Sequence, residues 1–208
     1  MITSASGWRK VFAESGEKDD DNGEIGDLNR TIAALAAETF ADYMLAQKKS
    51  PLIIIGMDTR PTGPAIAETM LRVFLAKKIA VSYTGIIASP EIMVYAHSAD
   101  GFVYISASHN PIGYNGIKFG LNDGGVLNGQ ENAKLVAEFE KKCARPDAAE
   151  YAQKLASSCS DIDLDWVFAE SIATKHSAAN TYRSFEKEVI SGSKEPAVQN
   201  AVFARIRQ

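Results

Sequence analysis

The stretch Ser106–Pro111 carries a hydroxyl, an imidazole and an amide, and the segment Tyr114–Lys118 adds a primary amine soon after it. The stretch comes directly after Phe102–Ile105, a short apolar run rich in aromatic and β-branched residues, which is typical of a buried strand. Open α/β sheets place their chemistry in polar loops at the carboxyl ends of such strands. This set of groups suits the handling of phosphate better than the hydrolysis of peptides or esters.

Ser108 is the candidate nucleophile or phosphate carrier of the loop, and the alternative is a serine that only caps a turn. Ser106 continues the strand, so we expect its side chain to point into the fold. The sequence lacks the pattern Gly-x-Ser-x-Gly, and the nucleophile elbow of acyl hydrolases is therefore not supported.

His109 and Asn110 follow Ser108 directly. Adjacent residues on a turn seldom face each other, so we expect His109 to contact a phosphate or to orient the backbone, not to act as a base for Ser108. An exposed histidine without a role is the alternative. Asn110 precedes Pro111 and is biased toward an extended backbone, which fixes the shape of the loop.

Three cationic side chains complete the candidate site. Lys118 lies on a short predicted strand, where alternation separates it from the apolar residues on either side. An ammonium there could neutralise charge during phosphoryl transfer, or shuttle a proton if burial lowers its pKa, and a surface lysine is the alternative. Arg9 and Arg60 are the other groups able to bind phosphate. Arg60 could bind phosphate in bidentate fashion, but we favour a structural clamp in which it pairs with Asp58.

Apolar periodicity predicts the order helix, strand, helix, strand, helix, strand, strand, helix. The helices are expected over 29–47, 62–77, 89–97 and 131–144, and the strands over 52–55, 79–83, 102–106 and 116–119. This order predicts an α/β fold, a three-layer α/β/α sandwich around a mixed, mostly parallel four-stranded sheet. The fourth strand is expected to be antiparallel, because so few residues cannot make a parallel crossover.

Composition narrows the function classes. The 208 residues are 46% hydrophobic with a net charge of -4, and no polybasic run favours nucleic acid. No apolar stretch reaches the roughly 18 residues of a membrane span, and the first residues lack the layout of a secretory signal. The two cysteines are too few for a disulfide framework. We therefore expect a soluble, cytoplasmic protein that binds neither nucleic acid nor membrane.

Four segments together resemble the α-D-phosphohexomutase family, the phosphoglucomutases and phosphomannomutases. Residues 106–111 are similar to the family's phosphoserine loop T-A-S-H-N-P, and residues 114–118 to its Y-N-G-x-K continuation. Residues 58–60 match D-T-R, and residues 6–9 match S-G-x-R, although Ser106 replaces the usual threonine and Lys10 a common glycine. The resemblance covers roughly residues 1–150, the first domain of the family.

By this resemblance, Ser108 carries the catalytic phosphate, which is exchanged between the 1- and 6-positions of a glucose or mannose phosphate. Arg9 and Lys118 flank the phosphoserine, Lys118 as a proton shuttle, while His109 and Asn110 contact the phosphate. The family also uses Mg²⁺, to which this chain would contribute only an oxygen of the Ser108 phosphate.

The family's loops for magnesium, sugar and the second phosphate lie in domains II–IV, and the sequence contains none of them. We therefore expect domain I over 1–160, and a connector with the helical start of domain II over 161–208. The isolated chain is expected to be inactive, with the missing domains as its partners. A non-catalytic phosphate-binding or interaction module, or a serine phosphohydrolase, is the alternative.

Overall fold

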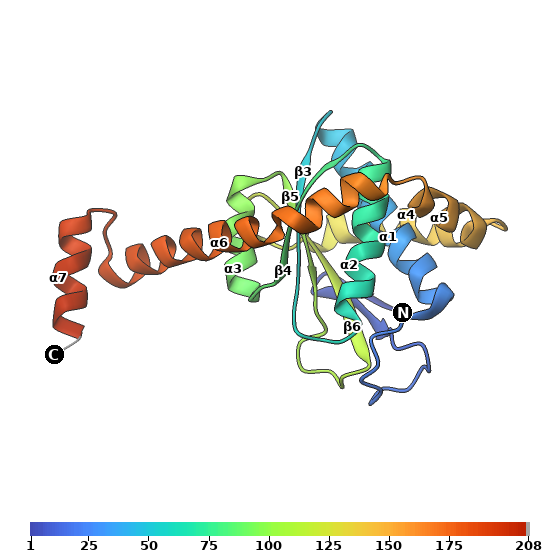
Figure 1. Ribbon diagram of the computed structural model, residues 1–208, viewed down its shortest axis with the longest axis horizontal. Helices are drawn as coiled ribbons and strands as arrows, with labels where there is room; N and C mark the ends of the chain where they lie inside the picture. Colours follow the sequence, from blue (N-terminus) through green and yellow to red (C-terminus); the bar gives the residue numbers. More distant parts are fainter. Residues whose placement is uncertain (207–208) are drawn as a thin grey trace.

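The computed structural model describes residues 1–206, in which helices surround a central sheet (Figure 1). The sheet has six strands in the order β1-β2-β6-β5-β3-β4. The strands are β1 (Ile2–Ser4), β2 (Gly7–Val11), β3 (Leu52–Met57), β4 (Ala80–Ile86), β5 (Gly101–Ile105) and β6 (Tyr114–Leu121). β3 runs parallel to both of its neighbours, β4 and β5. The pairs β5–β6, β6–β2 and β2–β1 are antiparallel.

The predicted α/β/α layering and the antiparallel strand after the Ser108 loop are confirmed. The predicted sheet is corrected in two respects: among the described residues it has six strands instead of four, and two of its five neighbouring pairs are parallel. The missed strands are β1 and β2, which form an N-terminal hairpin. Their sequence is short and carries Gly7, Arg9 and Lys10, so the strand pattern is hidden.

Helices cover both faces of the sheet. One face is covered by α1 (Gly26–Gln47) and α2 (Gly63–Ala76), with α4 (Gly129–Cys143) and α5 (Ala148–Ser157) packed beside them. The other face is covered by α3 (Ser89–Tyr95), which continues into the short 3-10 helix η1 (Ala96–Ser98), and by part of α6 (Asp161–Ser191). The last helix, α7 (Pro196–Ile206), contacts α6.

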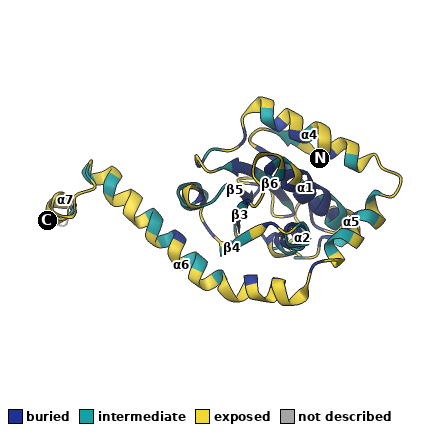
Figure 2. Ribbon diagram, turned by 90° about the horizontal axis from the view of Figure 1, so that it is seen from above, coloured by how far each residue is buried: buried dark blue, intermediate teal, exposed yellow. Residues whose placement is uncertain are grey.

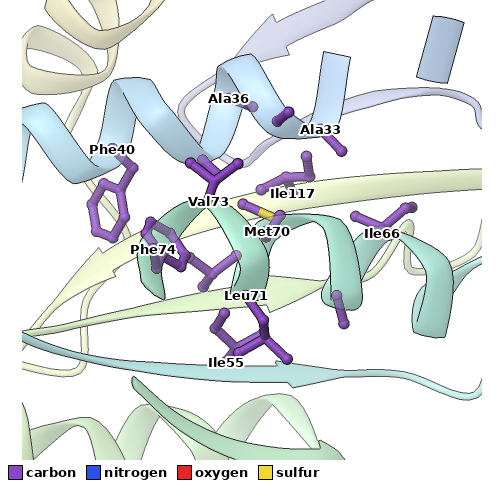
Figure 3. Close-up of a cluster of buried hydrophobic side chains, with 14 of the residues drawn as sticks. Ala33, Ala36, Phe40, Ile55, Ile66, Met70, Leu71, Val73, Phe74 and Ile117 are labelled. Atoms are coloured by element: carbon purple, nitrogen blue, oxygen red, sulfur yellow. The ribbon is translucent and has the colours of Figure 1, made fainter. Parts of the chain in front are cut away.

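Alternation along β3 divides the core between the two faces. Ile53 and Ile55 join the larger cluster under α1 and α2, where Phe40 and Met70 are also fully buried (Figure 3). Ile54 points the other way and packs in the smaller cluster with residues of α3. This continuous apolar run explains why β3 is a central strand, since both of its faces are covered.

The helix α6 begins at the sheet and runs beyond it. Its N-terminus is capped by the Ser160 hydroxyl, which accepts a hydrogen bond from the Asp163 amide at 3.4 Å. Leu164, Val167 and Ala178 are buried on the side that meets the sheet, whereas most of the helix is exposed (Figure 2). The predicted connector over 161–208 thus starts as part of the α/β body, and its residues 207–208 lie outside the described part.

A buried ionic cluster joins the helices on the α1 side. Glu38 of α1 is only 4% exposed, and its Oε1 accepts a hydrogen bond of 2.5 Å from the Tyr151 hydroxyl of α5. Its Oε2 lies 2.9 Å from Lys142 Nζ, in an ion pair that lacks hydrogen-bond geometry. The hydrogen bond to Glu38 raises the pKa of Tyr151 to about 12.

We expect Tyr151→Phe to lower the free energy of unfolding by about 1–3 kcal/mol, because Glu38 loses a donor while it stays buried. The pKa of Tyr151 is raised from 10.0 to about 12 on folding. The difference in the free energy of unfolding between variant and wild type should therefore be constant below pH 10 and should vanish as the pH rises through 12. Urea unfolding at several pH values measures this, with Tyr182→Phe on the distal part of α6 as control. Equal stability of Tyr151→Phe and wild type at pH 7 would contradict it.

Candidate functional site

The candidate site lies at the carboxyl ends of β3 and β5, on one face of the sheet. The Asp58 amide donates to the Ile105 carbonyl at 2.9 Å, and the Ser106 amide donates to the Gly116 carbonyl at 2.9 Å. The backbone hydrogen bonds of the sheet therefore continue up to the start of the Ser108 loop. In the register of the sheet, Lys118 lies opposite Tyr104 and Arg9 opposite Gly116. Two strands from distant parts of the sequence thus bring Arg9 and Lys118 to neighbouring positions.

Ser108 is exposed at the start of a loop whose backbone is fixed by hydrogen bonds to Ser106 and Asn110. Its amide donates to the buried Ser106 hydroxyl at 3.1 Å, which agrees with the expectation that Ser106 points into the fold. The Asn110 side chain donates to the Ala107 carbonyl at 2.7 Å and closes the turn. Ser108 has φ 58, in the left-handed region that non-glycine residues rarely adopt. The loop therefore presents the hydroxyl to solvent on a strained backbone.

His109 is placed differently from what the sequence indicated. We expected Ser108 and His109 not to face each other, but Ser108 Oγ lies 3.5 Å from His109 Nδ1. The left-handed backbone at Ser108 reverses the chain locally and brings the two side chains to the same side. The separation is at the outer limit for a hydrogen bond, so the two groups are neighbours without a strong interaction.

Lys118 is half-buried, and its aliphatic stem passes over Gly7. A Cβ atom at Gly7 would lie 2.9 Å from Lys118 Cγ, and Gly7 has φ +130, so both space and backbone demand glycine there. Lys118 Nζ lies 5.6 Å from the centroid of the Tyr104 ring. Burial is the main cause that lowers the pKa of Lys118, and Arg9 lowers it further, against an opposing effect of Asp58.

Arg9 adds a second cation to the same region. Its guanidinium donates to the Ser6 carbonyl at 3.2 Å and to the Ser6 hydroxyl at 3.4 Å, while its Nε is buried with no partner among the described residues. Within residues 1–206, neither Arg9 nor Lys118 has a carboxylate oxygen within 4.0 Å. Two adjacent cations with no carboxylate in direct contact favour an anion nearby.

Asp58 and Arg60 lie behind the loop. The Asp58 Oδ1 accepts the Arg60 amide at 3.0 Å, and its Oδ2 lies 3.4 Å from Arg60 Nε. Arg60 is 8% exposed, and its two terminal nitrogens donate to carbonyl oxygens of the loop. Its guanidinium thus faces the underside of the loop, on the opposite side from solvent.

Sequence reasoning missed Tyr104 as part of the site. Its ring lies beneath Lys118, and its hydroxyl donates to the Ile87 carbonyl at 3.1 Å. Alternation along β5 could have placed Tyr104 on the same face as Ser106, but the cross-strand pairing with Lys118 required the register of the sheet.

No group of three or more His, Cys, Asp or Glu side chains in residues 1–206 is placed to hold a metal ion. None of the described helices is both long and apolar enough to cross a membrane. A cavity of about 430 Å³ lies between α1, α2 and α5, and the Ser108 loop does not line it.

Comparison with known proteins places these features in a family. Residues 5–145 match the model of the phosphoglucomutase/phosphomannomutase α/β/α domain I. The chain is 39% identical over 126 residues to a phosphoglucosamine mutase of Leuconostoc mesenteroides, covering 58% of this chain and 27% of that protein. It is 33% identical over 147 residues to the phosphoglucosamine mutase of Bacillus subtilis, covering 68% and 32%. A phosphoglucosamine mutase of Klebsiella pneumoniae is 29% identical over 212 positions, covering 90% and 46%.

A solved structure agrees with these matches. The putative phosphomannomutase from Thermus thermophilus superposes with a TM-score of 0.51 at 27% identity, over 65% of this chain and 28% of that chain. The chain spans between about a quarter and a half of the length of the curated relatives described above. Because the domain I model covers residues 5–145, more than half of the 208, the chain belongs to the phosphoglucomutase/phosphomannomutase family.

Proposed function

We propose that this chain provides the phosphate-carrying part of a phosphohexomutase, with Ser108 as the carrier. The observation that supports this most is that Arg9 and Lys118, two cations on the sheet face from which the Ser108 loop projects, have no carboxylate oxygen within 4.0 Å among the described residues. A phosphoserine carries close to two negative charges at neutral pH, which these cations can neutralise. The exposed hydroxyl of Ser108 leaves room for a substrate to approach.

The proposed reaction is a transfer in two halves. The phosphoserine donates its phosphoryl group to a free hydroxyl of a hexose phosphate, which gives a bound hexose bisphosphate and a free Ser108 hydroxyl. The sugar then reorients, and the phosphate at its other position returns to Ser108 Oγ. The net result is movement of phosphate between the 1- and 6-positions of the hexose.

Lys118 has two tasks in this scheme. In its neutral form it accepts the proton of the attacking hydroxyl, and it then returns a proton to the leaving oxygen. The burial that lowers its pKa makes the neutral form more accessible. Arg9 stays charged throughout and neutralises the transferring phosphoryl group, while His109 and Asn110 contact its oxygens.

The substrate is proposed to be a hexose phosphate. Three relatives compared above are phosphoglucosamine mutases, so glucosamine phosphate joins glucose and mannose phosphate as a candidate. Recognition of the sugar is assigned to parts of the relatives that this chain does not cover. On this view the 208-residue chain alone does not turn over substrate, and its partner is the remainder of such a protein.

Magnesium would bind with few ligands from this chain. Asp58, the carboxylate close to the site, is engaged with Arg60, so the ligand on offer is an oxygen of phosphorylated Ser108. Magnesium prefers about six oxygen ligands, so the others would have to come from outside this chain or from water. When bound, the ion would offset the negative charge of the phosphate.

Titration with sulfate tests the proposed anion site, because sulfate keeps its double charge over the pH range of interest. In NMR spectra of the chain we expect sulfate to change the chemical shifts of Ser108 and Lys118. The affinity for sulfate should be lowered about tenfold or more in Lys118→Met and Arg9→Gln. Sulfate affinity should fall as the pH rises through the lowered pKa of Lys118, below 10.5, because only the protonated amine attracts an anion.

Lys134→Met is the matched control, since Lys134 is an exposed lysine of α4 remote from the loop. It should bind sulfate like the wild type at constant ionic strength. Equal affinity of Lys118→Met and wild type, or an affinity that does not change with pH, would count against the proposal.

A further inference from the structure

We propose that Arg60 is the positioning residue of the Ser108 loop: its guanidinium sets the backbone path that presents the Ser108 hydroxyl, without touching the phosphate. The inference rests on the proposed function in that it assigns the phosphate to Ser108. It rests separately on contacts that do not depend on any reaction.

The guanidinium of Arg60 donates hydrogen bonds to several backbone carbonyl oxygens of the loop. One terminal nitrogen, Nη2, donates to the carbonyls of Ser108 at 2.8 Å and Asn110 at 2.6 Å. The other, Nη1, donates to those of Pro111 at 2.6 Å and Tyr114 at 2.9 Å. A longer contact of 3.4 Å joins Nη1 to the Ile112 carbonyl. One side chain thus holds the loop from Ser108 to the start of β6.

These contacts use all the terminal donors of the side chain. An arginine has five N–H groups, one on Nε and two on each terminal nitrogen. Nε faces the Asp58 carboxylate at 3.4 Å, and the four terminal N–H groups are directed to loop carbonyls. No terminal N–H group is left to bind a phosphate, and Nε is paired with Asp58, which distinguishes Arg60 from Arg9, whose Nε is unpartnered among the described residues.

The position of Arg60 explains how a strained serine is maintained. Ser108 adopts φ 58, a conformation that costs free energy for a side chain with a Cβ atom. Two bonds hold it from either side: the Ser108 amide donates to Ser106 Oγ, and the Ser108 carbonyl accepts from Arg60. Without Arg60, several carbonyls that now face a buried cation would have no partner, so the loop would relax toward a common backbone conformation.

Hydrogen exchange of the loop tests this role in the 208-residue chain. The amides of Ser108, Asn110 and Tyr114 donate to partners within the loop and should be protected in the wild type. In Arg60→Lys and Arg60→Gln we expect this protection to fall by at least about tenfold, while core amides such as that of Val103 keep theirs. Lysine preserves the charge but not the planar fork, so it should not rescue the loop.

Sulfate affinity and chemical rescue add readouts that general destabilisation would not produce. Sulfate affinity should fall equally in Arg60→Lys and Arg60→Gln. In Arg60→Ala, guanidinium at tens of millimolar should restore loop protection and sulfate affinity, whereas the same concentration of sodium should not. If Arg60→Ala is unfolded, refolding by guanidinium alone carries the same meaning, because this ion otherwise favours unfolding.

The outcomes separate the two proposals. Unchanged loop protection in all Arg60 variants, or wild-type behaviour of Arg60→Lys, would overturn the positioning role and leave a role for charge alone. A wild-type chain that binds no sulfate, together with a loop that opens in the variants, would contradict the proposed function and support the role of Arg60. Arg72→Ala is the control, since Arg72 pairs with Glu68 and Asp161, away from the loop.

Discussion

Ser108→Ala is expected to abolish phosphate exchange in a protein that joins residues 1–145 of this chain to the remainder of the Bacillus subtilis relative. Removal of an enzyme's attacking group lowers kcat by about 10⁴-fold to 10⁶-fold. Ser106, the nearest serine, is buried and accepts the Ser108 amide. The measurement is the conversion of glucosamine 1-phosphate, glucose 1-phosphate or mannose 1-phosphate to the 6-phosphate.

Ser98→Ala serves as the control, because Ser98 is an exposed serine whose hydroxyl only donates to the Tyr95 carbonyl. This variant should exchange phosphate at the rate of the parent. The same assay separates the alternative functions. Net release of inorganic phosphate would indicate a phosphohydrolase, and a joined protein that folds but exchanges no phosphate would favour a non-catalytic module. Residual exchange by Ser108→Ala close to the parent rate would contradict the role of Ser108.

Trp8→Ala is expected to lower the free energy of unfolding by about 3–5 kcal/mol. Trp8 is 0% exposed, and its ring packs against Phe119 and Phe139 with centroid separations of 5.1 and 4.9 Å. Its Nε1 donates to the Asn132 Oδ1 of α4 at 2.9 Å. Truncation therefore leaves a cavity, and it leaves the Asn132 amide oxygen without its donor. The expected loss is a large part of the free energy of unfolding of a typical domain.

Trp8→Phe is the matched variant, since it keeps an aromatic ring but removes the donor to Asn132. It should lose about 1–3 kcal/mol, between wild type and Trp8→Ala. Urea unfolding measures both variants. Because Trp8 adjoins Arg9 on β2, the alanine variant should also weaken sulfate binding. A loss below about 1 kcal/mol in Trp8→Ala would show that the N-terminal hairpin adds little to the core.

The parallel part of the fold was predictable because its sequence carries strong local signals. β3 begins with Leu52 and three isoleucines, and β5 is a run of mostly aromatic and β-branched residues. The intervening helices have clear apolar periodicity. β2 could not be found in this way, since it joins the sheet through pairing with β6, more than a hundred residues away. Local patterns do not encode such long-range register.

The residues of the candidate site could be selected from the sequence, but their contacts with one another could not. Ser108, His109 and Lys118 stood out because they lie together in the sequence after a strand. The neighbourhood of Arg9 and Lys118 depends on the pairing of β2 with β6, which no local pattern reveals. The sequence could not show that Arg60 directs its donors to the loop carbonyls, because backbone carbonyls are common to every residue.

The C-terminal region illustrates a limit of periodicity. Apolar periodicity indicates a helix over 181–190, with Tyr182, Phe185 and Val189 in register, whereas the structure has one helix, α6, from Asp161 to Ser191. Its first half escaped prediction because Ile162, Trp166 and Ile172 are exposed, so apolar residues do not follow one face.

The central claim, that Ser108 carries phosphate, is tested most directly by locating phosphate on the protein. The chain, alone and joined to the remainder of the relative, is incubated with an excess of hexose 1,6-bisphosphate, and intact and fragment masses are measured. We expect a gain of one phosphate on Ser108 in the joined protein, and none in Ser108→Ala. A joined protein that is folded but gains no phosphate, or that carries it on another residue, would contradict the account.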